Sequence, residues 1–278
     1  MKLIKPSYTI IEQQPGEIGM LKHIETCGRV AWKSEERVTD DSYIKFVEML
    51  KGVNHGSVLE HGTIYLKVGQ YDWNTICGNH YEDYFKNPYS IAVYHGDYYY
   101  ITTNYRVLVE NNWLDDLKYQ CEPTEYHEKR VTVRMICDVG ISREFNRHRT
   151  FSITEQSTRY CNFSKEKFGS ELTFIRPFWL NEVFIEDYEN DFSDEDESPF
   201  LSLLAHAEDA YFQLINKNYK PQQARNVLPL SLKTEVIYTG FISDWKHFFE
   251  LRTASGAHPQ AQELAIPLHN EFQKLNLL

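Results

Sequence analysis

The sequence predicts an α+β protein in which helices and strands are mixed along the chain. Between residues 16 and 32, apolar residues recur every three or four positions, which is the spacing of one helix face. From Thr63 to Val68 apolar and polar residues alternate, which is typical of a half-buried strand. Because no internal repeat and no linker interrupts the 278 residues, we expect a single domain over 1–278.

The composition is that of a packed globular protein, with 42% hydrophobic and 14% aromatic residues. A formal net charge of -11 argues against non-specific binding of DNA or RNA, which needs a broad basic surface. The five cysteines are odd in number and include no Cys-x-x-Cys pair, so we expect no zinc site, no disulfide framework and a reducing compartment. No signal peptide or apolar run of transmembrane length is evident, so we expect a cytoplasmic protein without membrane contact.

Four elements are expected before residue 70. Residues 1–12 are predicted to form a strand. A helix is expected at 16–32, and a second from Thr39 to Gly52, because Thr39 and the two aspartates after it are good helix-start residues. The strand at 63–68 follows.

A long stretch, about 71–130, then precedes an arginine-rich segment. Its centre predicts a tyrosine-rich β-hairpin, with strands from Tyr89 to His95 and from Tyr98 to Val109 around a Gly96-Asp97 turn. A short helix is expected from Trp113 to Tyr119. Tyrosines on such strands can stack on nucleic-acid bases, but cross-strand packing is their usual role and is the interpretation we favour.

The later elements are predicted from periodicity and from proline, glycine and serine signals. A strand at Lys129–Cys137 leads through Gly140 into a helix that carries Arg143–Arg149. The acidic run at 182–197 is expected to be a solvated loop. The other expected elements are a strand or loop at 172–179, helices at 199–216 and from Pro221, a strand at 234–242, a helix from Ser243 through Arg252, and a helix at 259–275 that Pro267 kinks.

The segment 143–163 carries the clearest functional signal. Residues 147–149 read Arg-His-Arg, and such crowding of cations costs self-repulsion unless an anion lies among them. Glu155, Ser157 and Arg159 follow at alternate positions, so an extended backbone would direct all three side chains to one face. A carboxylate, a hydroxyl and a guanidinium together suit a ligand that has both a polar ring and a phosphate.

The spacing of this segment resembles a known signature. Arg-His-Arg, seven residues, Ser157, and then x-Arg-Tyr is similar to the signature of the flavin-dependent thymidylate synthases, the ThyX family. His55-Gly56-Ser57 resembles the family's second motif, and 224–229 resembles its Ala-Arg-x-Val-Leu-Pro segment. The likeness runs from 55 to 252, outside the stretch 71–130, which the resemblance marks as an insertion.

The resemblance implies a fold, an assembly and a reaction. Family members are similar in having a mixed sheet with packed helices, and they form homotetramers whose active sites lie between subunits. The implied activity is that of a methyltransferase, the reductive methylation of dUMP to dTMP. Methylenetetrahydrofolate would supply the carbon, and NADPH would reduce bound FAD. The tyrosine-rich β-hairpin would then be an insertion in a ThyX-like domain.

The resemblance also implies roles for individual residues. Arg252 matches the residue credited with activating the uracil, and one well-placed donor of this kind stabilises developing charge by about 3–4 kcal/mol. The implied dUMP contacts are Glu144, Arg147, Glu155, Gln156, Ser157, Thr158, Arg159, Arg225 and Arg252. The implied FAD contacts are His55, Ser57, Arg147, His148, Arg149, Glu155 and His247.

Four positions in three segments depart from the family pattern. Ala31 stands where the family has a serine, so one hydroxyl is missing. Phe241-Ile242-Ser243 stands where the family often has Asn-x-Arg, which removes an amide and a cation from the flavin site. Glu144 stands where glutamine is common, and its carboxylate would repel a phosphate unless it is paired, for which Arg143 is the neighbouring candidate.

Other interpretations stay open on the residues alone. His55, Glu60 and His61 are zinc-ligand types, but they lack the His-Glu-x-x-His spacing; no metal is expected, and Glu60 and His61 would orient their turn by hydrogen bonds. A nucleic-acid-binding module would use the Arg-His-Arg segment and the hairpin, and a phosphate-ester hydrolase would use Glu155 as base. Cys161 lacks the Pro-Cys-His setting of the other thymidylate synthase class. The resemblance favours the flavin-dependent methyltransferase.

Overall fold

The computed structural model describes residues 1–53, 55–70, 81–180 and 199–278. Its centre is a four-stranded antiparallel sheet in the order β2-β6-β9-β7. The strands are β2 (Ser7–Ile11), β6 (Arg130–Asp138), β9 (Lys233–Phe241) and β7 (Ser152–Glu155). β6 and β9 pair along their full lengths, from Arg130 opposite Phe241 to Asp138 opposite Lys233. Mixed helix and sheet content is therefore confirmed.

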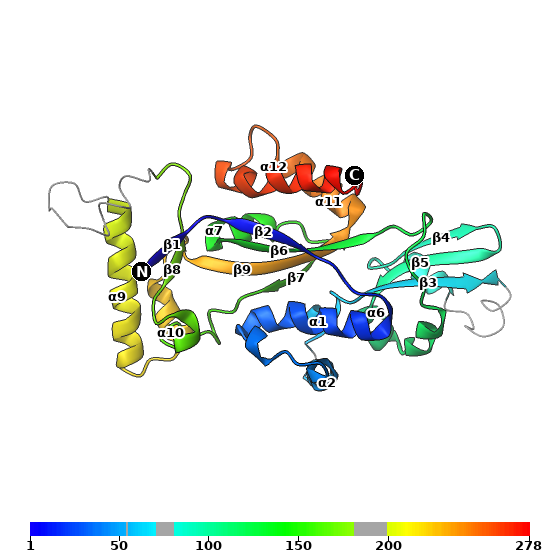
Figure 1. Ribbon diagram of the computed structural model, residues 1–278, viewed down its shortest axis with the longest axis horizontal. Coiled ribbons are helices and arrows are strands. Elements are labelled where there is room, and N and C mark those ends of the chain that lie inside the picture. Colours follow the sequence, from blue (N-terminus) through cyan, green and yellow to red (C-terminus); the bar gives the residue numbers. More distant parts are fainter. Residues whose placement is uncertain (54, 71–80, 181–198) are drawn as a thin grey trace.

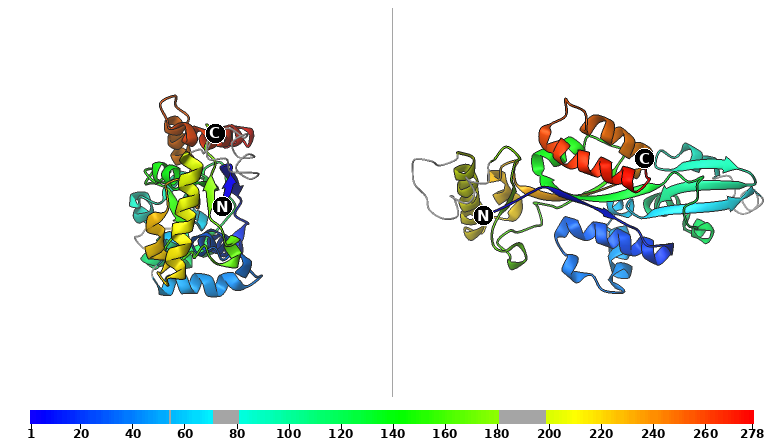
Figure 2. Two further views of the ribbon diagram at one scale, coloured as in Figure 1. Left: turned by 90° about the vertical axis from the view of Figure 1, so that its left-hand side faces the viewer. Right: turned by 45° about the horizontal axis from the view of Figure 1, so that its top comes forward.

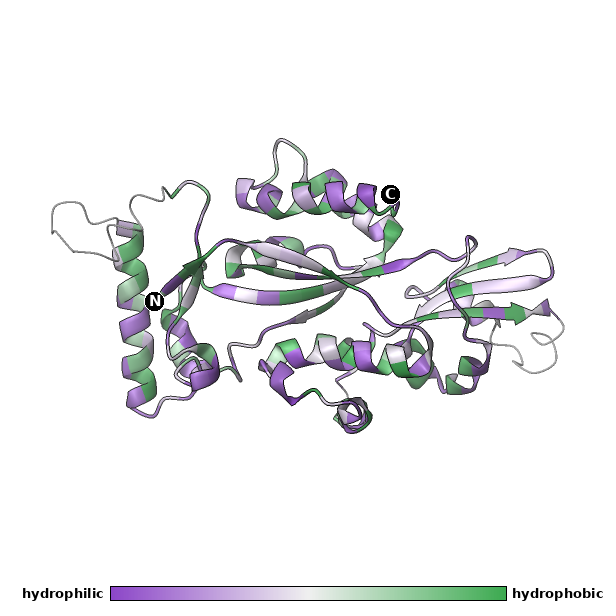
Figure 3. Cartoon of the chain, in the orientation of Figure 1, coloured by the Kyte–Doolittle hydropathy of each residue, from purple (hydrophilic) through white to green (hydrophobic). Residues whose placement is uncertain are grey.

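Helices cover both faces of this sheet (Figure 1). On one face lie α7 (Val139–Phe145), α11 (Ile242–Arg252) and α12 (Pro259–Lys274), which pack on the sheet through a large apolar cluster around Trp245 and Tyr238. On the other face lie α1 (Gly16–Trp32), α2 (Ser42–Gly52) and α3 (Gly56–Leu59). Hydrophobic and hydrophilic residues are interspersed along α1 and along α9 (Pro199–Asn216) in Figure 3, as expected for helices that bury one face.

The α1 face of the sheet contains a buried histidine–threonine network. The ring nitrogens of His61 lie 2.7 Å from Thr239 Oγ1 and 2.9 Å from Thr154 Oγ1. His23 Nε2 lies 2.9 Å from Thr132 Oγ1, which lies 2.8 Å from Thr239 Oγ1. Burial and the nearby Arg130 cation lower the pKa of His23 to about 4, and burial also holds the pKa of His61 well below its usual value. Both rings are therefore neutral at pH 7.

A second, three-stranded sheet has the order β3-β5-β4 and lies at one end of the molecule. Its strands are β3 (Thr63–Gly69), β4 (Ile91–His95) and β5 (Tyr98–Asn104), with α5 (Tyr81–Lys86), α6 (Tyr105–Asn111) and the 3-10 helix η2 (Leu114–Tyr119) around them. The expected strand over 98–109 is too long. It ends at Asn104, whose side chain accepts a hydrogen bond from Val107 N at 3.2 Å and so begins α6.

The tyrosines of this sheet pack on one another and on neighbouring side chains. The rings of Tyr94 and Tyr99 lie 4.8 Å apart, and those of Tyr100 and Tyr126 lie 4.9 Å apart. Lys67 Nζ lies 4.1 Å from the centre of the Tyr98 ring. These contacts agree with the packing role favoured for the tyrosines.

The opposite end of the molecule carries a parallel strand pair and two helices (Figure 2). β1 (Lys2–Ile4) pairs with β8 (Thr173–Ile175), beside α9 (Pro199–Asn216) and α10 (Pro221–Ala224). The expectation of one strand at 1–12 is wrong, because Lys5 and Pro6 separate two strands, β1 and β2, which belong to different sheets. Pro6 has no backbone N–H to donate to a neighbouring strand, so it interrupts the strand.

One further expectation is wrong, and others fall outside the described residues. The helix expected to carry Arg143–Arg149 ends at Phe145, so residues 147–149 follow the helix instead of lying in it. The acidic run at 182–197, the start of the proposed insertion (71–80) and Cys77 lie outside the described residues. Among the described helices, none is long and apolar enough to cross a membrane.

Acidification should destabilise the fold through His23. The pKa of His23 is about 4 in the folded protein and near 6.5 when unfolded, so the unfolded chain binds the extra proton between these values. Stability should be intact above about pH 6.5 and fall by about 3 kcal/mol as the pH drops to 4. Urea unfolding at several pH values should show a shallower loss for His23→Gln than for the wild type. The exposed His206→Gln is the control; equal slopes in all three proteins would contradict this assignment.

Candidate active site

A cleft of about 750 Å³ lies where the end of α7 meets the end of α11. Six of the residues expected at a ligand site line it, namely Glu144, Arg147, His148, Arg149, His247 and Arg252. The remaining described lining residues are Thr150, Leu251, Ala254, Gly256, Ala257 and His258. A space of this size is in the range of small-molecule sites. We call it the arginine cleft.

Arg252 is fixed at the wall of the arginine cleft by three acceptors. Its Nε donates to His148 Nε2 at 3.0 Å, its Nη1 to Glu144 Oε2 at 3.0 Å and its Nη2 to the backbone oxygen of Glu144 at 2.5 Å. Glu144 lies at the end of α7, so Arg252 caps that helix and not its own. The expected pairing of Glu144 with Arg143 is wrong; Arg143 is exposed.

His148 is buried beside several cations. Burial, followed by Arg252, His247 and Arg147, lowers the pKa of His148 to about 4. The ring is neutral at pH 7, which leaves Nε2 free to accept the proton that Arg252 donates. His247 and Arg149 are exposed at the rim of the cleft.

Glu155 lies on β7 and is tied to the α7 side of the central sheet. Its Oε1 accepts hydrogen bonds from Ser142 Oγ at 2.8 Å and Thr234 Oγ1 at 3.0 Å, and its Oε2 accepts one from Asn146 Nδ2 at 3.3 Å. Tyr238 in turn donates to Asn146 Oδ1 at 2.8 Å. Both carboxylate oxygens of Glu155 are thus occupied by donors of the protein itself, which does not favour the hydrolase interpretation with Glu155 as base.

The other expected nucleotide contacts form a second group, which we call the loop cluster. Its members are Gln156, Ser157, Thr158, Arg159 and Arg225. Arg225 Nη1 donates to Thr158 Oγ1 at 3.0 Å, and Arg159 N donates to Ser157 Oγ at 3.3 Å. Among the described lining residues of the arginine cleft, none belongs to the loop cluster.

Backbone hydrogen bonds hold the loop that carries Gln156 and Ser157 against β9 and the end of α1. Gln156 N donates to Glu235 O at 2.8 Å, and Ser157 N donates to Ala31 O at 3.0 Å. The Gln156 side chain is buried and accepts from Lys233 Nζ at 3.3 Å. Gln156 therefore supports the loop, and its side chain does not face solvent.

A buried charge cluster lies under this loop, and sequence reasoning missed it. Glu235 is 3% exposed; Lys33 Nζ donates to it at 2.9 Å, and Lys233 and Arg134 contact it as well. Burial alone would raise the pKa of Glu235, but the three cations outweigh burial and bring the pKa to about 2. A usable signal was the pair of charged residues, Lys233 and Glu235, at alternate positions of a strand whose residues are mostly buried.

His55 and Ser57 lie at the start of α3, and both are exposed. The His55 ring stacks on Trp32 at 5.9 Å, and Trp32 lies 6.4 Å from Tyr160. Trp32 thus links His55 to Tyr160, which follows Arg159 of the loop cluster, and neither His55 nor Ser57 is among the described lining residues of the arginine cleft.

The metal alternative finds no support at His61 and Glu60. His61 turns into the histidine–threonine network, and Glu60 accepts from Arg106 Nη1 at 2.6 Å. Within the described ranges, no three histidine, cysteine, aspartate or glutamate side chains gather as a metal site.

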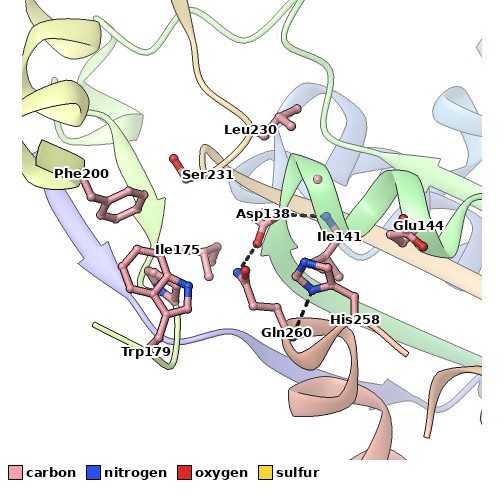
Figure 4. A pocket seen from close by; sticks show the side chains of 12 residues that line it. Asp138, Ile141, Glu144, Ile175, Trp179, Phe200, Leu230, Ser231, His258 and Gln260 are labelled. Atoms are coloured by element: carbon pink, nitrogen blue, oxygen red, sulfur yellow. Dashed lines mark hydrogen bonds between the residues drawn. The ribbon is translucent and has the colours of Figure 1, made fainter. Parts of the chain in front are cut away.

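Two smaller cavities adjoin the arginine cleft. One of about 320 Å³ shares Glu144 and His258 with the cleft and has Trp179 and Phe200 on its far wall (Figure 4). The other, of about 160 Å³, shares Thr150 with the cleft. Its lining includes Phe241 and Ser243, the two positions at which the sequence resemblance leads one to expect an amide and a cation, and also Arg130, whose Nη2 donates to Ser152 Oγ at 2.9 Å. Arg130 thus brings a cation to this region.

Comparisons with known proteins place these residues in context. Residues 111–276 match the family model described as thymidylate synthase complementing protein. The probable flavin-dependent thymidylate synthase of Paramecium bursaria Chlorella virus 1 is 30% identical over 139 residues, which are 49% of this chain and 62% of that protein. The flavin-dependent thymidylate synthase of Pyrococcus furiosus is 30% identical over 138 residues, 50% of this chain and 52% of that protein. The chain spans between half and two thirds of the length of these two curated relatives.

A solved structure also aligns with the chain. It is that of the UMP/dUMP methylase PolB from Streptomyces cacaoi bound with 5-Br dUMP. The alignment covers 99% of this chain and 93% of that chain, with 16% identity and a TM-score of 0.43. A TM-score of this size carries no conclusion about function.

Removing the charge of Glu235 should destabilise the protein. In Glu235→Gln, the three cations would face one another without their buried carboxylate, and breaking a buried ion pair in this way typically costs about 3–5 kcal/mol. Glu48→Gln, which breaks a pair whose carboxylate is 65% exposed, is the matched control and should change stability little. Chemical unfolding of both variants gives the comparison. Equal stability of Glu235→Gln and Glu48→Gln would show that the buried cluster is not stabilising the loop.

Proposed function

We propose that the chain, which belongs to the thymidylate synthase complementing protein family, catalyses the reductive methylation of dUMP to dTMP. Methylenetetrahydrofolate would be the carbon donor, and NADPH would reduce bound FAD. The observation that carries the proposal is the arginine cleft, in which the Arg-His-Arg segment meets Arg252. The family match over 111–276 and the names of the curated relatives support the same reaction. We further propose a ThyX-like, single-domain fold in a cytoplasmic protein.

The charges of the arginine cleft suit anionic ligands. Arg147 and Arg149 are exposed at its wall, and Glu144, the carboxylate among the lining residues, is bound to Arg252. Exposed guanidinium groups bind phosphate through paired hydrogen bonds. The residues present therefore fit the pyrophosphate of FAD. When bound, FAD would supply the hydride that reduces the transferred methylene group.

Arg252 is the residue proposed to activate the uracil. Attack by the uracil C5 requires electron density on the ring, which positive charge near the N3 side and its carbonyls stabilises. Three of the five N–H groups of Arg252 are taken by His148 and Glu144, and two remain for a ligand. A guanidinium that is already held in place costs no reorganisation when charge develops.

We propose that two copies of the chain complete one site. Arg252 and the Arg-His-Arg segment line the arginine cleft, whereas Ser157, Arg159 and Arg225 belong to the loop cluster. α10, which precedes Arg225, and α11, which ends at Arg252, lie on different sides of the central sheet in Figure 1. A homotetramer in which the loop cluster of one copy faces the arginine cleft of another would bring both groups onto one nucleotide.

We propose that the tyrosine-rich sheet does not bind substrate. Its aromatic side chains are engaged with one another and with Lys67. The family match begins at residue 111, after β4 and β5. This sheet would therefore add stability or assembly contacts to the domain that carries the reaction.

The purified protein tests the proposed function. It should bind FAD, with flavin absorbance that is released on denaturation, and it should convert dUMP to dTMP when methylenetetrahydrofolate and NADPH are supplied. A colourless protein that neither binds added FAD nor forms dTMP would reject the proposal. Salt-dependent binding of oligonucleotides by that colourless protein would favour the nucleic-acid-binding alternative instead.

Ser157→Ala should fold normally, because the Ser157 hydroxyl contacts only its own loop in the hydrogen bonds described. Loss of one hydrogen bond to the nucleotide should weaken dUMP binding by about 1 kcal/mol. Calorimetric titration with dUMP measures this change, and FAD content checks that the site is otherwise intact. An unchanged dUMP affinity and unchanged activity would remove Ser157 from the site.

Arg252→Ala should slow the step that consumes the methylene group. Oxidation of reduced flavin by dUMP plus methylenetetrahydrofolate should fall by roughly 10²–10³ or more, the usual effect of one lost electrostatic donor. Reduction of flavin by NADPH needs no activated uracil and should persist. Arg252→Lys should rescue poorly, because an ammonium cannot reproduce the planar fork.

Anaerobic stopped-flow measurements at saturating dUMP separate the two steps for these variants. Arg37→Ala, which removes an arginine from an exposed surface pair with Glu36, is the matched control and should oxidise flavin at the wild-type rate. Near-normal oxidation by Arg252→Ala would leave Arg252 as a helix cap without a part in the reaction.

A further inference from the structure

We propose that His148 is a positioning residue: its Nε2 holds Arg252 in place, and His148 does not act by contacting the cofactor or the nucleotide. This inference rests on the proposed function, because it concerns the residue that would activate the uracil. It differs from the flavin-contact role that the sequence resemblance implies for His148.

The geometry of the Arg252 guanidinium supports this role. Glu144 binds both Nη atoms, Nη1 through its carboxylate and Nη2 through its backbone oxygen, and His148 binds Nε. Without an acceptor at Nε, the Arg252 side chain would be held by Glu144 alone. The guanidinium plane could then rotate about the two hydrogen bonds to Glu144. His148 therefore sets the plane in which the two remaining N–H groups of Arg252 point.

The surroundings of His148 keep Nε2 available as an acceptor. The ring lies 5.0 Å from Phe248, 6.2 Å from Phe151 and 5.8 Å from His247. It is 6% exposed, and the charged groups that face it, Arg147 and Arg252, disfavour a second proton. Because Arg252 is always protonated and Nε2 accepts from it, the single imidazole proton is on Nδ1.

The two ring nitrogens allow the two possible roles to be separated by substitution. In His148→Gln, the side-chain amide reaches the place of Nε2 and can still accept from Arg252. In His148→Asn, the amide reaches only the place of Nδ1, which is the nitrogen left over for a ligand contact. Positioning through Nε2 predicts that glutamine rescues and asparagine does not. A ligand contact through Nδ1 predicts the reverse order.

The experiment measures anaerobic flavin oxidation by dUMP plus methylenetetrahydrofolate, and FAD affinity, for both variants. His148→Asn should lower the oxidation rate by about 10²-fold, the usual effect of a displaced catalytic group, and should leave FAD affinity unchanged. His148→Gln should recover most of this rate. In the Arg252→Ala background, His148→Asn should cause no further loss, because the group that it positions is already gone.

Three outcomes would overturn the proposal. They are weaker FAD binding in His148→Gln than in His148→Asn, equal rates in the two variants, and a full additional rate loss from His148→Asn in the Arg252→Ala background. A wild-type protein that forms no dTMP would reject the proposed function and not the contact between His148 and Arg252.

In that case thermal unfolding tests whether the contact between His148 and Arg252 exists. The contact predicts non-additive changes in the unfolding midpoint for His148→Asn and Arg252→Ala, and additive changes would reject it.

Discussion

The full-length antiparallel pairing of β6 and β9 determines where the active-site candidates meet. β6 leads directly into α7 and β9 into α11, so the two helices start at opposite ends of one strand pair. Nine paired residues span about 30 Å, and the two helices together span about 27 Å along the same face. Running towards each other, the helices must bring their C-terminal ends together. Glu144 at the end of α7 therefore meets Arg252 at the end of α11, and the arginine cleft forms at this junction.

The two faces of the central sheet are stabilised in different ways. The face under α11 and α12 is apolar and aromatic, and it gives the cleft a rigid base. The face under α1 buries the histidine–threonine network and the Glu235 cluster, whose polar side chains are joined by hydrogen bonds. Polar groups buried in this way specify one arrangement of neighbours, because any other would leave them without partners. They fix the strand ends from which the loop cluster begins.

Sequence periodicity predicts elements better than it predicts their ends or their long-range partners. The helices at 16–32 and 199–216 have the expected bounds because each carries a long apolar stripe. The motif resemblance also pointed to six of the twelve described residues that line the arginine cleft. The partner of Glu144 was not predictable, because local sequence offers Arg143 whereas the structure pairs Glu144 with Arg252, 108 residues away. The Glu235 cluster was missed although Lys233 lies two residues away, because the other two cations, Lys33 and Arg134, come from distant segments.

Sharing of one site between two copies is tested most directly by co-expressing Arg252→Ala and Arg225→Ala chains with different tags and isolating the mixed oligomers. Each parent should form almost no dTMP. In mixed oligomers, the intact Arg252 of one chain can face the intact Arg225 of the other, so dTMP formation should reappear. Mixed oligomers as inactive as both parents would show that the arginine cleft and the loop cluster do not join across subunits.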